Sequence, residues 1–176
     1  ALGNYGGSTQ TFALLPGSSA IDAGDDAICA ASPVNNLDQR GVARLQGAHC
    51  DVGAYESRGF TLAQLNGDNQ STPVNTAFAN PLALSVTSAY TEPVNGGQVT
   101  FVGPLTGAGT SPITNTATII SGGVSLTLTA NSTAGGPYTV ATSAAGAANI
   151  VFSLSNTAPC ESNITVTNNA DSGAGS

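Results

Sequence analysis

The chain has 176 residues, a length that fits one or two domains. Its 10 acidic residues outnumber 3 arginines, giving a formal charge of -7, which argues against binding to nucleic acids or anionic lipid surfaces. No stretch approaches the roughly 20 apolar residues that a membrane-spanning helix requires. The 22 Gly and 9 Pro, among many Thr, Ser and Asn, favour short strands over helices, so we expect an all-β fold.

The first segment, residues 1–58, opens with LGNYGGSTQTFALLPGSSAIDAGDDAIC and ends in LDQRGVARLQGAHCDVGAYE. From Leu2 to Glu56 these phrases resemble the final coils and cap of bacterial right-handed parallel β-helix surface proteins, an adhesin-like group that includes polymorphic outer-membrane proteins. The resemblance implies a partial parallel β-helix at an extracellular or cell-surface location. It implies no catalytic residue, because the carboxylates of polysaccharide-degrading β-helix proteins lie on middle coils that this chain lacks.

The cysteines divide into a pair and a remainder. In the cap family, cysteines at the places of Cys29 and Cys50 staple the last coil, so the resemblance implies a disulfide between them. Closing such a loop stabilises by about 3 kcal/mol in the chain-entropy model and requires an oxidising compartment. The residues alone leave open two buried free thiols or, less favoured, a metal site with His49. Cys160 is left as an exposed thiol or as half of an intermolecular bond.

Acidic residues are dense in the first segment, at positions Asp22, Asp25, Asp26, Asp38 and Asp51. Because Arg40 and Arg44 lie in the same segment, we expect Asx-turns and structural ion pairs. The residues expected in the pairs are Asp22, Asp38, Arg40, Arg44 and Asp51. Calcium binding is an alternative, although the spacing of an EF-hand is absent, and acid–base catalysis by paired carboxylates is less favoured still. We therefore expect no cofactor and no metal.

The second segment, residues 59–159, shows alternation of apolar and polar residues between turn signals. The alternating runs are Leu82-Leu84-Val86, Val99-Phe101, Val124-Leu126-Leu128, Tyr138-Val140 and Ile150-Phe152-Leu154. This pattern predicts an antiparallel β-sandwich with inward-facing aliphatic side chains. The phrases PVNGGQVTFVGP, VSLTLTANSTAGGPYTVATSAAG and NIVFSLSNTA resemble bacterial Ig-like domains of giant surface proteins, which implies an Ig-like fold that acts mostly as a spacer.

The last segment, residues 160–176, reads CESNITVTNNADSGAGS and resembles the opening strand of another bacterial β-helix domain. Ile164 and Val166 alternate with threonines, as expected of a strand with one apolar face. We therefore expect this segment to add as a strand to a second copy of the chain, with Cys160 as a candidate crosslink. A head-to-tail contact that does not close into a ring propagates as a filament.

These expectations describe a secreted, non-catalytic structural subunit of a fibre or surface array. Its partners would be copies of itself, joined through the C-terminal strand, with no nucleic acid and no membrane insertion. The alternative is an adhesin fragment that binds a glycan or a host protein. Glycan sites usually present aromatic side chains, but the few Tyr and Phe residues fall mostly within predicted strands, where core packing is the simpler role.

Overall fold

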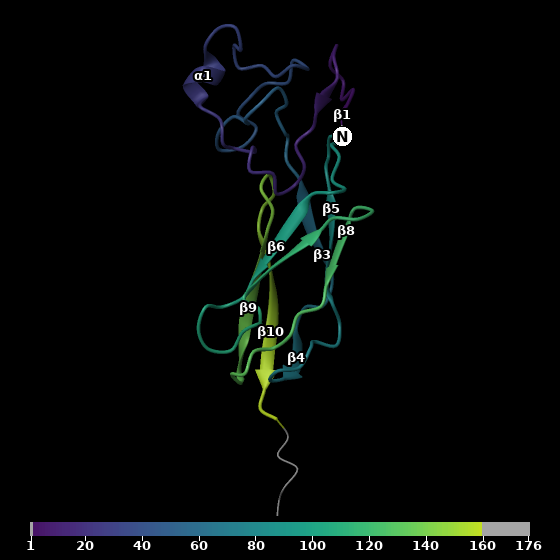
Figure 1. Cartoon of the computed structure of the whole chain (residues 1–176), viewed down its shortest axis with the longest axis vertical. Coiled ribbons are helices and arrows are strands. Elements are labelled where there is room, and N and C mark those ends of the chain that lie inside the picture. Colours follow the sequence, from purple (N-terminus) through teal and green to yellow (C-terminus); the bar gives the residue numbers. More distant parts are fainter. Residues whose placement is uncertain (1, 160–176) are drawn as a thin grey trace, which may run out of the picture.

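The computed structural model describes residues 2–159 and is all-β apart from one short helix. Figure 1 shows an elongated molecule, with a loop-rich N-terminal region (residues 2–58) at one end and a two-sheet sandwich (residues 59–159) extending from it. The elements in chain order are β1 (Leu2–Gly3), β2 (Thr11–Phe12), α1 (Asp26–Ala30), β3 (Thr61–Asn66), β4 (Gln70–Pro73), β5 (Leu82–Thr87), β6 (Gln98–Val102), β7 (Thr114–Thr118), β8 (Gly123–Leu126), β9 (Gly135–Ser143) and β10 (Ile150–Thr157). The expected donor strand, with Cys160, Ile164 and Val166, lies outside the described residues.

The sandwich consists of a three-stranded sheet, ordered β3-β5-β8, and a five-stranded sheet, ordered β4-β10-β9-β6-β7. Neighbouring strands run antiparallel in both sheets except for β4 and β10, which are parallel. The chain therefore leaves the first sheet after β3 and joins the far edge of the second sheet as β4. This change of sheet ties the two layers together near the start of the sandwich.

The core lies between the two sheets and is formed by the inward side chains of their strands. On β5 the buried residues Leu82, Leu84 and Val86 alternate with half-exposed ones, as expected of a strand with one face covered. Phe101 of β6 and Phe152 of β10 are fully buried, with ring centroids 6.5 Å apart. Each large apolar side chain buried in this way stabilises the fold by about 1.5–3 kcal/mol.

The free edge of β10 is covered by side chains where β4 does not reach. The Gln64 side-chain amide donates to the Val151 carbonyl, and Asp68 accepts from the Ser153 amide at 2.7 Å. These two contacts substitute for the backbone partners that a neighbouring strand would supply. An unpaired edge invites pairing with another chain, so this arrangement protects the sheet.

The N-terminal region contains little regular structure. β1 and β2 form one antiparallel pair, and the one-turn helix α1 is capped by Asp25, whose side chain accepts from the amides of Ala27 and Ile28. A parallel β-helix is not shown among residues 2–58, in contrast to the coils implied by the sequence resemblance. Within the described residues, no helix is long and apolar enough to cross a bilayer.

Carboxylates take the place of a strand ladder in this region. Asp38 accepts from the backbone amides of Arg40, Val42 and Glu56. The Glu56 carboxylate in turn accepts from three amides, those of Leu45, Gln46 and Asp51. Buried amides need an acceptor, and at these positions side-chain oxygens supply it in place of a neighbouring strand.

Candidate functional site: the ionic junction between the two regions

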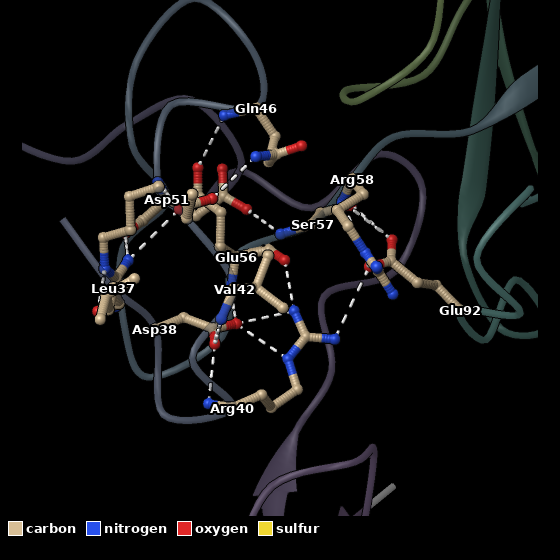
Figure 2. Close-up of polar contacts among 12 residues, drawn as sticks. Leu37, Asp38, Arg40, Val42, Gln46, Asp51, Glu56, Ser57, Arg58 and Glu92 are labelled. Atoms are coloured by element: carbon tan, nitrogen blue, oxygen red, sulfur yellow. Dashed lines mark hydrogen bonds and ion pairs between the residues drawn. The ribbon is translucent and has the colours of Figure 1, made fainter.

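A network of buried charged and polar side chains joins the N-terminal region to the sandwich (Figure 2). We call it the junction network; its members are Asp38, Arg40, Arg44, Asp51, Glu56, Ser57, Arg58 and Glu92. It contains all three arginines of the chain, which has no lysine. Seven of the members come from the N-terminal region, and Glu92 comes from the loop between β5 and β6.

The innermost ion pair joins Asp38 and Arg40. The Arg40 Nη2 lies 2.7 Å from Asp38 Oδ2 and the Nε lies 2.8 Å from the same oxygen, with side-chain exposures of 4% and 0%. The guanidinium also donates to the Glu56 carbonyl and lies 3.5 Å from the centroid of the Tyr55 ring. Removing one partner of such a buried pair is strongly destabilising, because the other charge is left without compensation.

Arg44 is equally enclosed but binds mostly carbonyl oxygens. It donates to the carbonyls of Leu37, Asp51 and Gly53 at 3.2, 3.0 and 2.7 Å. Within residues 2–159 its one ion pair is with the Glu56 carboxylate, at 3.3 Å. Arg44 therefore joins the segment around Leu37 to residues 51–56.

Glu92 carries the network across to the sandwich. Its carboxylate, 1% exposed, accepts from the Ser57 hydroxyl at 3.0 Å and from the Arg58 amide at 3.1 Å. Two guanidinium groups lie at longer ion-pair distances, Arg40 at 3.8 Å and Arg58 at 3.7 Å. The Glu92 carboxylate of the sandwich thus contacts Arg40, Ser57 and Arg58 of the N-terminal region.

Backbone and apolar contacts reinforce this junction. The Gln98 amide donates to the Pro16 carbonyl, and the Gly17 amide donates to the Ala145 carbonyl. Gly17 has φ +82° and its α-carbon approaches so closely that an added Cβ would lie 2.5 Å from the Gln98 carbonyl oxygen, so only glycine fits there. Ile21 of the N-terminal region belongs to the same buried apolar cluster as the sandwich core.

The pKa values of Asp38 and Asp51 are shifted in opposite directions. Burial alone would raise the pKa of Asp38, but hydrogen bonds from the Glu56 amide and from Arg40 outweigh it and hold this pKa below its ordinary value. Burial raises the pKa of Asp51, and the neighbouring charges of Glu56 and Asp22 act in the same direction. The paired aspartate is thus held ionised, while the unpaired one is easier to protonate.

The structure brings together most of the charged residues singled out from the sequence, but with different partners. Asp38 pairs with Arg40, whereas Asp22 and Asp51 form no ion pair with an arginine within residues 2–159. Asp51 instead accepts from the amides of Asp22 and Ser57, and Asp22 accepts from the His49 amide. Backbone amides therefore supply the hydrogen bonds to these two carboxylates. Arg44 donates to the backbone carbonyl of Asp51, not to the Asp51 carboxylate.

The disulfide implied by the resemblance is present. Cys29 on α1 is bonded to Cys50, with the two Cα atoms 6.7 Å apart. Beside it, the exposed His49 ring lies 2.9 Å from Asp26, which raises the pKa of the imidazole through this hydrogen bond and charge. No group of three His, Cys, Asp or Glu side chains among the described residues is arranged to hold a metal ion.

Sequence reasoning missed Glu56 and Glu92 as members of the network. Glu92 carried a usable signal, because the whole of residues 59–159 contains only one other charged side chain, that of Asp68. An isolated acidic residue in an otherwise uncharged segment is a candidate partner for arginines elsewhere in the chain. Glu56 ends the phrase DVGAYE, but nothing in that phrase shows that its carboxylate is buried.

Comparisons with known proteins do not assign a family or a function to this chain. Models of protein families, curated proteins and solved structures were each compared with the chain, and none of the three comparisons found a match. The function of the junction is therefore inferred from its contacts. They join the N-terminal region to the sandwich through Glu92.

Proposed function

We propose that the chain is a non-catalytic, extracellular structural subunit of a fibre or surface array. The observation that carries this proposal is the junction network, in which Arg40, Arg58 and Ser57 of the N-terminal region meet Glu92 of the sandwich, within one elongated body. Contacts of this kind hold the two regions in a defined orientation. A module that extends a surface array needs this property.

The shape of the molecule supports the same function. Figure 1 shows the N-terminal region at one end of the long axis, while β10 ends at the opposite end. Successive copies joined through these two ends would extend in a line. The Cys29–Cys50 disulfide supports an oxidising location, because such bonds persist mainly outside the cytosol.

We further propose that residues 59–159 form an Ig-like module and residues 1–58 the cap of a β-helix. The two sheet orders support the first assignment, since β5 and β8 share one sheet while β6, β9 and β10 share the other, an arrangement typical of that sandwich. For the cap, support comes from the sequence phrases and from the disulfide that they imply. The module boundary is crossed by Ile21, which packs into the sandwich core.

Assembly is proposed to occur by addition of the C-terminal strand around Ile164 and Val166 to a second copy. One candidate acceptor among the described strands is β7, which ends the five-stranded sheet and has no neighbour on its outer side. The edge of β10 is less suitable, because Gln64 and Asp68 cover it.

Negative-stain microscopy and light scattering of the 176-residue chain test this function. We expect filaments or linear oligomers, and their loss when Ile164 and Val166 are both replaced by Asp. The unfolding transition of this variant should match that of the parent chain. Strictly monomeric chains at all concentrations, or filaments that persist in the double variant, would contradict strand addition.

A second candidate function is binding of a glycan or host protein by an adhesin fragment. One observation favours it: three of the four tyrosines, Tyr5, Tyr55 and Tyr90, line a single pocket. The sequence had placed aromatic residues mainly within strands. The fold instead gathers these three at the junction.

A further inference from the structure

A polar pocket of about 400 Å³ opens at the junction, between residues 4–6 and the loop residues 90–92. Its wall is built from four segments of the chain, because Arg40, Tyr55 and Arg58 line it as well. Pockets of this size are large enough for a small organic ligand. The pocket belongs to the junction, because Arg40, Arg58 and Glu92 of the junction network line it.

Aromatic side chains dominate one side of this pocket. Tyr5 and Tyr55 pack edge to face, with ring centroids 5.7 Å apart, and Tyr55 is buried. Burial and the nearby Glu92 charge raise the pKa of Tyr55 to about 12, so its hydroxyl stays protonated. Tyr90 is 49% exposed even though the Arg58 guanidinium lies 4.0 Å from its ring centroid. The rim therefore presents the Tyr90 ring to solvent, while Tyr55 lies buried behind it.

The two arginines that line the pocket differ in their use of hydrogen-bond donors. Arg40 donates to Asp38 and to the Glu56 carbonyl, so it belongs to the internal structure. In contrast, the Arg58 side chain makes no hydrogen bond within residues 2–159, its Nε has no acceptor, and its one ionic contact is Glu92 at 3.7 Å. Arg58 is also the more accessible, with 28% side-chain exposure against 4% for Arg40.

The rim of the pocket also contains a strained residue. Thr91 has φ +57°, a left-handed conformation that is unfavourable for a β-branched side chain. This conformation lies between exposed Tyr90 and buried Glu92. Strain of this kind is concentrated at sites where a protein holds side chains for a ligand.

From these contacts we propose that the pocket binds a neutral saccharide. The Arg58 charge faces Glu92, and the Arg40 charge faces Asp38, so no net positive charge remains to attract an anionic ligand. A sugar ring has an apolar face that packs on an aromatic ring and hydroxyl groups that accept from a guanidinium. This binding does not depend on assembly of the chain and specifies the site for the second candidate function.

Tyrosine fluorescence provides a direct readout, because the chain has no tryptophan and three of its four tyrosines line the pocket. The disulfide-bonded chain is titrated with cellohexaose, xylohexaose, mannohexaose and maltohexaose, and hits are repeated by calorimetry. We expect at least one of these neutral sugars to bind with a Kd of about 1 mM or tighter. A hexamer of galacturonic acid serves as the anionic comparison and should bind more weakly.

Two variants test the site itself. Tyr90→Ala removes the exposed ring, and Arg58→Lys keeps the charge but removes the planar donor group. Each should weaken binding by about tenfold while leaving the melting curve within error of the parent. Tyr138→Phe, at the tyrosine outside the pocket, is the matched control and should leave the Kd unchanged.

Several outcomes overturn the proposal: no neutral sugar binds, only the uronate hexamer binds, or the two variants bind as the parent does. The assay is repeated on the chain with Ile164 and Val166 replaced by Asp. Binding retained in that variant separates the saccharide site from strand addition, so the two proposals fail independently. Binding that is lost there together with assembly would place the sugar between copies and contradict a site within one chain.

Discussion

Glu92 accepts a hydrogen bond from the Ser57 hydroxyl at 3.0 Å, across a separation of 35 residues. Ser57 lies at the end of the N-terminal region and Glu92 in the sandwich, so this bond spans the junction. Both residues are buried, at 6% exposure each. A buried carboxylate persists only when donors and cations surround it, so the joining of the two regions depends on this residue.

We expect Glu92→Gln to destabilise the junction by about 3 kcal/mol, because it removes the charge that faces two guanidinium groups. Urea denaturation followed by circular dichroism measures this loss. Asp68→Asn is the matched control, since it neutralises the other acidic residue of the sandwich at an exposed position while retaining an acceptor oxygen. Equal losses in the two variants would show that Glu92 has no special role.

Replacing Cys29 and Cys50 together by Ser should lower the free energy of unfolding by about 3 kcal/mol, the value expected for a loop of this size. Thermal unfolding without reductant measures the difference. The parent chain treated with reductant should show the same loss. Intact mass after alkylation under non-reducing conditions checks the bond itself, and labelling of three thiols would contradict it.

The pKa of Asp38 predicts how the junction responds to acid. Its folded-state pKa lies below the unperturbed 3.8, so its stabilising contribution is complete above that pH and is lost as the pH falls through the folded value. The free energy of unfolding should therefore decline as the pH falls below about 4. Asp38→Asn should be less stable at neutral pH and show a flatter decline in this window.

Asp51→Asn is the control for this pH experiment. The pKa of Asp51 is raised, so its ionisation opposes folding only above 3.8, as the pH rises through the folded value. Its removal should leave the acid decline in place. If Asp51→Asn flattens the decline as strongly as Asp38→Asn, the assignment of the acid response to the Asp38–Arg40 pair is wrong.

The covered edge of β10 leads to a prediction about self-association. Replacing Gln64 and Asp68 together by Ala exposes the Val151 carbonyl and the Ser153 amide. We expect more dimer and aggregate by light scattering, because an open strand edge templates pairing with another chain. Thr61→Ala, an exposed change on the same strand as Gln64, is the control and should leave the chain's oligomeric state as it was.

The strands that were predictable are those whose own side chains alternate. Leu82, Leu84 and Val86 define β5 without reference to any neighbour. β4 and β7 could not be recognised, because runs such as TNTAT carry no apolar face and become strands only through their partners β10 and β6. Leu128 was assigned to a strand but lies beyond the end of β8.

The sequence predicted several of the charged residues that form the candidate site, but not most of their hydrogen-bond partners. The sequence placed Asp38 beside Arg40, and a separation of two residues is enough for them to meet in a turn. The contacts of Arg44 with three carbonyls could not be predicted, because backbone oxygens have no identity in a sequence. The contribution of Glu92 depends on the fold, which brings the loop after β5 to the N-terminal region.

The location of the three arginines in the junction network determines how susceptible the folded chain is to proteases of trypsin-like specificity. Such enzymes cleave after lysine or arginine, and this chain offers no lysine. Arg40 and Arg44 have side-chain exposures of 4% and 6%, which leaves Arg58, at 28%, as the most accessible cleavage point. Since cleavage requires local opening of the backbone, the same contacts that join the two regions protect the chain from digestion.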